Sequence, residues 1–263
     1  MMRPLTFMAL VACVTVPRSA VAQSLTRRVM SDRDGSVHFA FASRPGVCGD
    51  GATYLRDGFG GTGRIYQGGN FSGHMRDDDW PPCIPGPVHV VAMMSGGELV
   101  RLHTYVGAQL RAREQTGREL GLVSVDEAAD FLTRVAEQAH GGASADAILP
   151  LVLADSIVPW PALFRFARDE RMPRAIRGKA DFWLARGAAA KLGVADRDDD
   201  DDDLRISAVF ALSQQPKDVA VPQLISLARH NTHPAVRAQA VFWLGQSHDP
   251  RALDLFEEIL RTR

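Results

Sequence analysis

The second half of the chain repeats one short phrase three times, and this repetition limits the folds that the chain can adopt. Residues 176–184 read IRGKADFWL, residues 204–212 read LRISAVFAL and residues 236–244 read VRAQAVFWL. In each copy an arginine follows an apolar residue, an alanine stands three positions later, and phenylalanine and leucine follow at fixed offsets. The copies start 28 and 32 residues apart. Because such a period is typical of stacked helical repeats, the phrase predicts a repeat architecture.

Each repeat is predicted to be a pair of helices. Pro161 and Pro222 stand where the first helix would begin, and Pro173 and Pro234 stand just before the phrase that forms the second helix. Proline is tolerated in the first turn of a helix because the N–H that it lacks would have no partner there. Apolar residues within the phrase recur at the i, i+4, i+7 and i+8 spacing of one helix face. We expect two repeated sets to pack between helices, namely Ala180, Ala208 and Ala240, and Phe182, Phe210 and Phe242.

The phrase and its prolines resemble bacterial HEAT repeats of the phycobilisome-lyase-like type, over about residues 145–263. This resemblance implies a short α-helical solenoid that binds a protein partner. The sequence departs from the pattern at Asp181, where the other copies have Val209 and Val241. Residues 250–263 hold only one further helix, which we expect to cover the last open end of the stack.

The first 22 residues have the pattern of an export signal. Arg3 precedes an apolar run from Pro4 to Val16, and the AVA at residues 20–22 offers a small-x-small cleavage site. The alternative is a lipoprotein signal that would leave a lipid anchor on Cys13. No other apolar run reaches the roughly 18 residues needed to span a bilayer. We therefore expect a periplasmic or secreted protein without a membrane span.

Two cysteines, Cys48 and Cys83, lie beyond this segment. In an oxidising compartment a single pair predicts a disulfide. The bond would close a loop of 36 residues. Closing such a loop would stabilise the fold by roughly 3–4 kcal/mol, because it restricts the unfolded chain. The alternative is a metal site made by Cys48, His74 and Cys83 with a neighbouring aspartate, although the close ligand pairs of zinc sites are missing.

Residues 23–120 are predicted to form a β-rich domain. Val37, Phe39 and Phe41 alternate with other residues at the period of a strand, and the runs at 88–92 and 99–105 flank a Gly-Gly turn typical of a hairpin. Further on, Ser124 and Glu127 form a capping box that begins a helix. We assign residues 121–144 to this linking helix and residues 145–263 to the solenoid. The predicted fold class is α+β, with an N-terminal β-rich, disulfide-containing region before a short HEAT-like solenoid.

The candidate partner-binding residues are four arginines that recur at every third position in the first full repeat. They are Arg165, Arg168, Arg171 and Arg174. Arginine favours bidentate contacts with carboxylates, so this strip predicts contact with an acidic partner or with the chain's own aspartates. The alternative is an ordinary solvated helix face.

Other patterns that suggest chemistry have simpler structural explanations. The glycines of residues 58–63 fit G-x-G-x-x-G, but no helix starts well where Gly68 and Gly69 follow. The aspartate run at 196–203 lacks the spacing of an ordered calcium loop and is expected to be solvated, with calcium binding left open. His230, His233 and His248 are candidate metal ligands, and their positions at exposed loop ends explain them equally well.

The charge balance argues against nucleic acid. The formal net charge is −1, and it becomes −3 when Arg3 and Arg18 leave with the signal, whereas nucleic-acid binding normally requires a basic surface.

The chain has no His-Glu dipeptide, which HEAT-type hydroxylases use for iron, and no G-x-S-x-G or H-E-x-x-H motif. We predict a non-enzymatic protein–protein interaction scaffold of the cell envelope, with an unidentified protein partner, no cofactor and no metal. The alternative is an enzyme, either a lyase-like HEAT protein or a metal-dependent one.

Overall fold

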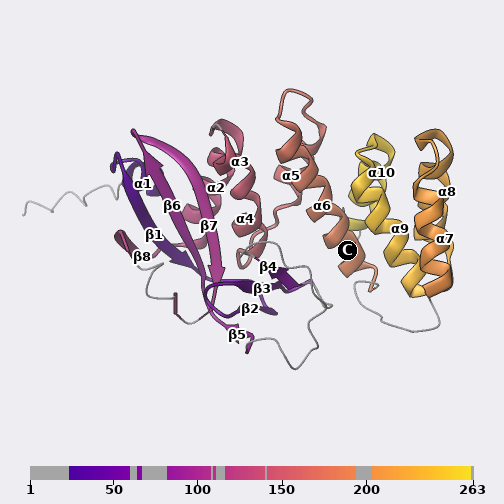
Figure 1. Ribbon diagram of the computed structural model, residues 1–263, viewed down its shortest axis with the longest axis horizontal. Helices are drawn as coiled ribbons and strands as arrows, with labels where there is room; N and C mark the ends of the chain where they lie inside the picture. Colours follow the sequence, from indigo (N-terminus) through magenta and orange to yellow (C-terminus); the bar gives the residue numbers. More distant parts are fainter. Residues whose placement is uncertain are drawn as a thin grey trace, which may run out of the picture.

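The computed structural model describes residues 24–59, 64–66, 82–107, 109–110, 116–139, 141–193 and 203–261. Strands make up one end of the molecule, and the helices from α5 onward make up the other (Figure 1). The expected export signal, Cys13, His74, Gly68, Gly69 and residues 196–202 of the aspartate run lie outside the described residues.

Two four-stranded sheets form the N-terminal part, which confirms the predicted β-rich region. The larger sheet has the order β7-β6-β1-β8, and it contains β1 (Gly35–Phe41), β6 (Val88–Ser95), β7 (Glu98–Val106) and β8 (Arg118–Leu122). The smaller sheet has the order β4-β3-β2-β5, and it contains β2 (Val47–Gly49), β3 (Tyr54–Asp57), β4 (Arg64–Tyr66) and β5 (Ile84–Pro85). Only the β1–β8 pair is parallel among the described strands.

The predicted hairpin is formed by β6 and β7, which turn at Gly96 and Gly97. Both glycines have positive φ, at 62° and 85°, a conformation that glycine adopts without steric cost. β1 lies inside the sheet, and its residues from Val37 to Phe41 are buried on both faces. Strict alternation of inside and outside residues is therefore absent from this strand.

Helix α2 (Val125–Gln138) covers the larger sheet, so the helix that we expected to link two parts also contributes to the core. The ring of Phe131 meets that of Phe39 edge to face, with 5.5 Å between centroids. The helix begins at the predicted capping box, where the Glu127 amide donates to Ser124 Oγ at 3.2 Å. Three short helices pack beside α2, namely α1 (Leu25–Val29), α3 (Gly142–Asp146) and α4 (Ile148–Leu153).

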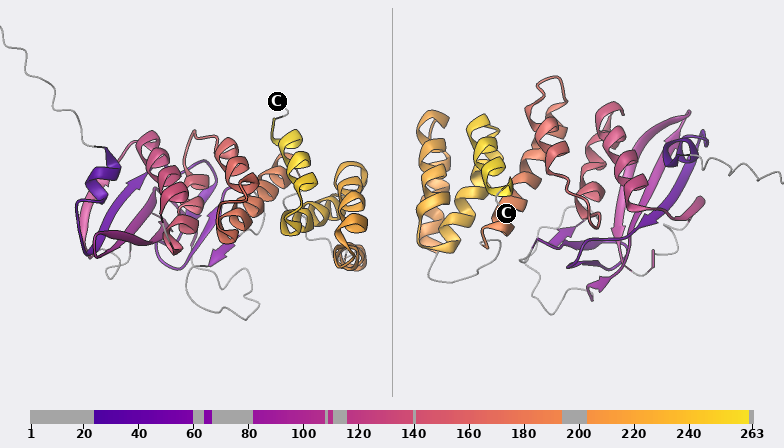
Figure 2. Two further views of the ribbon diagram at one scale, coloured as in Figure 1. Left: turned by 90° about the horizontal axis from the view of Figure 1, so that it is seen from above. Right: turned by 180° about the vertical axis from the view of Figure 1, so that it is seen from behind.

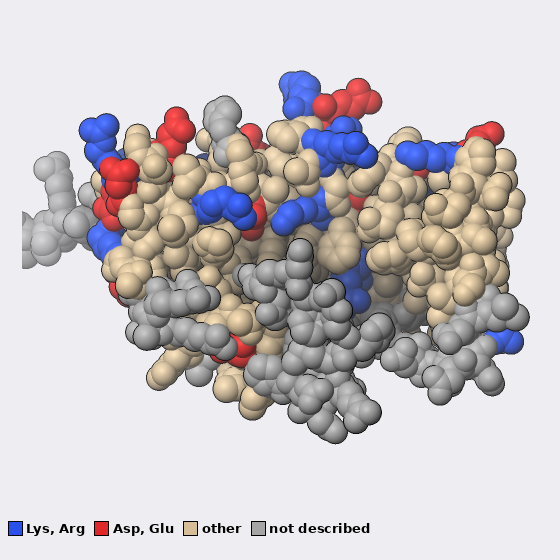
Figure 3. Space-filling model, in the orientation of Figure 1, with Lys and Arg blue, Asp and Glu red and all other residues tan. Residues whose placement is uncertain are grey.

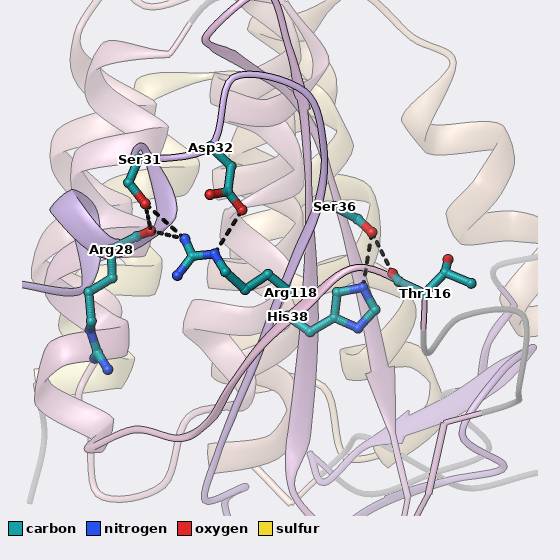
Figure 4. A network of polar contacts seen from close by, with 7 residues as sticks. All are labelled: Arg28, Ser31, Asp32, Ser36, His38, Thr116 and Arg118. Carbon is teal, nitrogen blue, oxygen red and sulfur yellow. Dashed lines mark hydrogen bonds and ion pairs between the residues drawn. The ribbon is translucent and has the colours of Figure 1, made fainter.

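A polar network ties the edge strand β8 to the first described residues (Figure 4). Arg118 Nε donates to Asp32 Oδ2 at 2.8 Å, and Ser36 Oγ donates to the Thr116 carbonyl at 2.6 Å. Gly117 has a φ of 121°, and a Cβ at this position would lie 2.2 Å from Ser36 Oγ. Only glycine therefore lets β8 approach β1 here.

The predicted disulfide joins Cys48 of β2 to Cys83, with 5.2 Å between the two Cα atoms. The bond closes a loop with a sequence separation of 35 and fixes β2 beside β5. Because both sulfur atoms are consumed in this bond, the alternative metal site with Cys48, His74 and Cys83 is wrong.

The helical part is arranged in two rows. It contains α5 (Trp160–Arg168), α6 (Arg174–Lys191), α7 (Asp203–Ser213), α8 (Lys217–His230), α9 (Pro234–Ser247) and α10 (Pro250–Arg261). One row has the order α6, α9, α7, and the other has the order α5, α10, α8. The pair α9–α10 therefore lies between α5–α6 and α7–α8, as Figures 1 and 2 show from three sides.

The expectation that α10 covers the open end of the stack is wrong. Its apolar residues, among them Leu253 and Phe256, pack inside the stack, where α10 contacts α5, α6, α8 and α9. The reason lies in the sequence between α6 and α7, which is rich in aspartate and has no apolar stripe for a first helix. α7 is therefore paired with α8, the helix that follows it in the chain. α10 then lies between α5 and α8 in the row formed by the other helix of each pair.

Small residues allow α6 and α9 to approach closely. Ala180 and Ala240 have no exposed surface, as predicted. A Cβ at Gly245 would lie 2.5 Å from the Cβ of Ala185, so glycine is needed where the two helices meet. The equivalent Ala208 is exposed, because no described helix follows α7 in its row.

A polar and aromatic junction joins the smaller sheet to the helices. Asp57 at the end of β3 is buried, and its Oδ2 accepts a hydrogen bond of 2.7 Å from Arg186 Nε of α6. The ring of Phe59 lies 5.7 Å from Trp160 and 6.1 Å from Trp183. The buried residues of both parts form one continuous core.

Candidate protein-binding surface

Three phenylalanines at the same position of the repeated phrase lie on the surface of the helices. Phe182 of α6, Phe242 of α9 and Phe210 of α7 are 36%, 43% and 48% exposed. The expectation that these side chains pack between repeats is wrong, because alanines and Gly245 make the close helix contacts instead. Since α6, α9 and α7 are neighbours in one row, we call these three side chains the phenylalanine row.

Two tryptophans lie behind the phenylalanine row and support it. The Phe182 ring meets Trp183 at 5.1 Å between centroids, and the Phe242 ring meets Trp243 at 5.0 Å, both edge to face. Phe210 contacts the same Trp243 at 5.2 Å. Aromatic pairs at these distances attract one another beyond simple burial. The exposed rings are therefore held in place by their neighbours.

A groove of about 190 Å³ lies between Phe182 and Phe242. Alanines of α6 and α9 contribute apolar surface, and Gln239 and Gln246 contribute amide groups. Among the described residues that line the groove, only Arg186 is charged, and it is paired with Asp57. Figure 3 shows few charged side chains over the neighbouring end of the molecule, where α7 and α8 lie.

Three of the four predicted arginines have carboxylate partners within the chain. Arg165 bonds to Glu137, Arg168 bonds to Glu257 and Asp254, and Arg171 bonds to Asp169. Hydrogen bonds from Arg171 lower the pKa of Asp169 to about 2. Arg174, the first residue of α6, lies on the wall of a cavity instead. Contact of this strip with a partner stays a prediction.

The histidines suggested as ligands do not come together around a metal. His230 ends α8, and His233 stands before α9, and both are exposed. His248 follows α9 and lies 2.6 Å from Asp181, measured from Nδ1 to Oδ2. Within the described ranges no three His, Cys, Asp or Glu side chains gather as metal ligands would.

The Asp181–His248 pair was missed by sequence reasoning, which noted Asp181 only as a departure from the repeat. Asp181 is 5% exposed, and burial raises its pKa against the opposing effects of the His248 hydrogen bond and the Arg177 charge. His248 adopts a left-handed backbone conformation with a φ of 51°. A polar residue at a position where the other copies have valine was the available indication of this pair.

Comparisons with known proteins bear on the helical part alone. Neither a search of curated proteins nor a search of solved structures finds a match to this chain. No helix in the part of the chain that the structure describes has the length and hydropathy needed to cross a membrane. Residues 182–263 match the family model for HEAT repeats, from within α6 through α10. The helical region of this chain therefore contains a HEAT repeat.

Proposed function

We propose that this protein is a non-enzymatic interaction scaffold of the cell envelope, and that its HEAT-like helical solenoid binds a partner protein through the phenylalanine row. HEAT repeats commonly mediate protein–protein interactions and generally act as scaffolds without catalysis, and residues 182–263 match them. The single observation that carries the proposal is the exposure of one repeated phenylalanine on three adjacent helices.

The occupant that best fits this surface is an amphipathic helix of the partner. Packed helices lie about 8–10 Å apart, so the phenylalanines of neighbouring helices repeat at about that distance. Apolar residues seven positions apart on an α-helix are separated by roughly 10 Å along its axis. A partner helix lying across α6, α9 and α7 therefore places such residues against successive phenylalanines, with one in the groove between Phe182 and Phe242.

The location in the envelope rests on two supports. The first is the apolar run after Arg3 with the AVA at residues 20–22, which has the pattern of an export signal. The second is the Cys48–Cys83 disulfide, because disulfides persist mainly in oxidising compartments. Subcellular fractionation of expressing cells, with amino-terminal sequencing of the mature chain, tests the location of the protein separately from its binding.

The binding test compares three variants as bait in an envelope extract. F182S/F242S removes two rings of the row, V158S/V219S removes apolar surface elsewhere, and R171S/R174S changes the strip without breaking the ion pairs of Arg165 and Arg168. A protein retained by the wild type and by V158S/V219S, but lost from F182S/F242S, is then purified and titrated. Loss of one aromatic hot spot costs about 2 kcal/mol or more, which corresponds to a roughly 30-fold rise in Kd, so we expect the double variant to raise Kd by at least that factor.

Two results would change the proposal. Loss of the partner from R171S/R174S alone would move the interface to the arginine strip. Equal binding by all baits would exclude both surfaces. Circular dichroism of each variant checks that the fold is intact, and we expect little change because the substituted side chains are partly or fully exposed.

A further inference from the structure

A cavity lined by cations opens where α6 and α8 begin. It consists of two adjoining hollows of about 250 Å³ and 370 Å³, which share Arg174, Lys217 and His248. The smaller hollow also has Arg177 and Asp181 on its wall. We call this pair of hollows the basic cavity. None of the three phenylalanines lines it, but Gln246 lines both the larger hollow and the groove beside the phenylalanine row, and Trp243 of the larger hollow contacts Phe210 and Phe242.

The positive charges of the basic cavity are only partly balanced by carboxyl groups, since the Arg177 charge acts on Asp181 and the Lys217 charge acts on Asp249. Arg174, Arg177 and Lys217 form no ion pair among the residues that the structure describes. The buried Nε of Arg177 also has no hydrogen-bond partner there. Two further carboxyl groups lie close by: Asp218 follows Lys217 in the chain, and Asp249 accepts hydrogen bonds of 2.9 Å from Nε and Nη2 of Arg251. Among the described residues that line the two hollows, three carry a permanent positive charge and one, Asp181, carries a carboxyl group.

Two helix N-termini add to this positive potential. α6 begins at Arg174 and α8 at Lys217, each after a proline and without a side-chain cap. Uncapped N-terminal amides attract anions, and helices normally begin with acidic residues for the same reason. α6 has no acidic residue in its first turn, whereas Asp218 follows Lys217 in the first turn of α8, so an anion would be favoured most at the start of α6.

Asp181 gives the cavity its chemical selectivity. The side chain is 7% exposed, and no described residue forms a hydrogen bond with its Oδ1, while Oδ2 contacts His248. An unpartnered buried carboxylate oxygen is costly, and the cost falls when a ligand donates a hydrogen bond to it. The position holds valine in the other two copies, so packing alone does not require a carboxyl group. The cavity thus favours an anion that also carries a proton.

We propose that the basic cavity binds inorganic hydrogen phosphate, with Arg174, Arg177 and Lys217 holding the charge and Asp181 accepting a hydrogen bond from the P–OH. Above neutral pH, hydrogen phosphate combines a double negative charge with one donor. Sulfate has the charge without the donor, and a phosphate monoester has lost its proton because its second pKa is about 6. This proposal does not rest on the proposed protein-binding function, although Gln246 lines both sites.

The test is calorimetric titration of the full mature chain with phosphate, sulfate and methyl phosphate at about pH 8, where a phosphate monoester has no proton left to donate. A hydrogen bond to a charged group contributes about 1.5–3 kcal/mol, so we expect phosphate to bind at least roughly tenfold more tightly than sulfate or the monoester. D181N should reduce this preference, because the carboxylate acceptor is gone.

Substitutions at two exposed cavity residues should leave the fold intact, so their effects report on phosphate binding. Lys217→Gln and Arg174→Gln should each weaken phosphate binding by roughly fivefold or more, since each removes a cation from the wall. Lys179→Gln is the matched control, because Lys179 is also exposed on α6 but does not line the cavity. Absence of phosphate binding, equal affinity for phosphate and sulfate, or equal effects of K217Q and K179Q would each overturn the proposal.

Discussion

The ion pair between Asp57 and Arg186 should carry much of the attachment between the smaller sheet and the helices. Their side chains are 3% and 19% exposed, and the two residues are 129 positions apart in the chain. Arg186→Met keeps the length of the side chain but leaves the Asp57 charge buried without its partner. Breaking a buried pair in this way costs about 3–5 kcal/mol. For a chain of this size, such a loss lowers Tm by roughly 6–20 °C.

Urea unfolding followed by circular dichroism measures this loss. Arg165→Met is the matched control, because Arg165 and Glu137 form an exposed pair with side chains 59% and 38% exposed, and such pairs contribute about 1 kcal/mol or less. The double variant D57N/R186M should recover part of the stability, since it removes the isolated charge. If R186M costs no more than R165M, the reasoning that burial makes this pair important is refuted.

Two further predictions concern the disulfide and the start of α10. C48S/C83S should lower the free energy of unfolding by roughly 2–5 kcal/mol, and a thiol reagent should label neither cysteine in the unreduced, denatured chain; labelling of both would contradict the bond. Hydrogen bonds from Arg251 hold the pKa of Asp249 below its ordinary value, so this pair stabilises the fold above about pH 4 and its contribution disappears as pH falls through the lowered pKa. Asp249→Asn should therefore destabilise the protein in urea titrations at neutral pH, and this effect should shrink as pH falls through the lowered pKa of Asp249; an equal loss at every pH would count against the ion pair.

Features set by neighbouring residues could be predicted from the sequence. The Gly96-Gly97 turn, the Ser124 cap and the helices of the repeated phrase depend on local backbone preferences and on short-range periodicity. The disulfide could be predicted because only one pair of cysteines was available beyond the expected signal.

Features set by distant contacts could not be predicted. A helix with two apolar sides does not reveal which neighbour each side meets, so the exposure of the phenylalanine row appeared only with the order α6, α9, α7. The Asp181–His248 pair joins residues 67 positions apart, and the partners of the arginine strip include Glu257, 89 positions from Arg168. Sequence periodicity carries no information on such pairings.

The position of α9–α10 between two earlier helix pairs also bears on the order in which the helices can pack during folding. In an ordinary repeat array each unit packs on the one before it, so the structure grows along the chain. Here α7 and α8 leave the ribosome before the helices that connect them to α6. Bonds such as Arg168 to Glu257 close only after that insertion, and long sequence separation slows folding. We expect the refolding kinetics to show a slow final phase. In this phase α10 would pack between α5 and α8 and so fix the positions of α7 and α8.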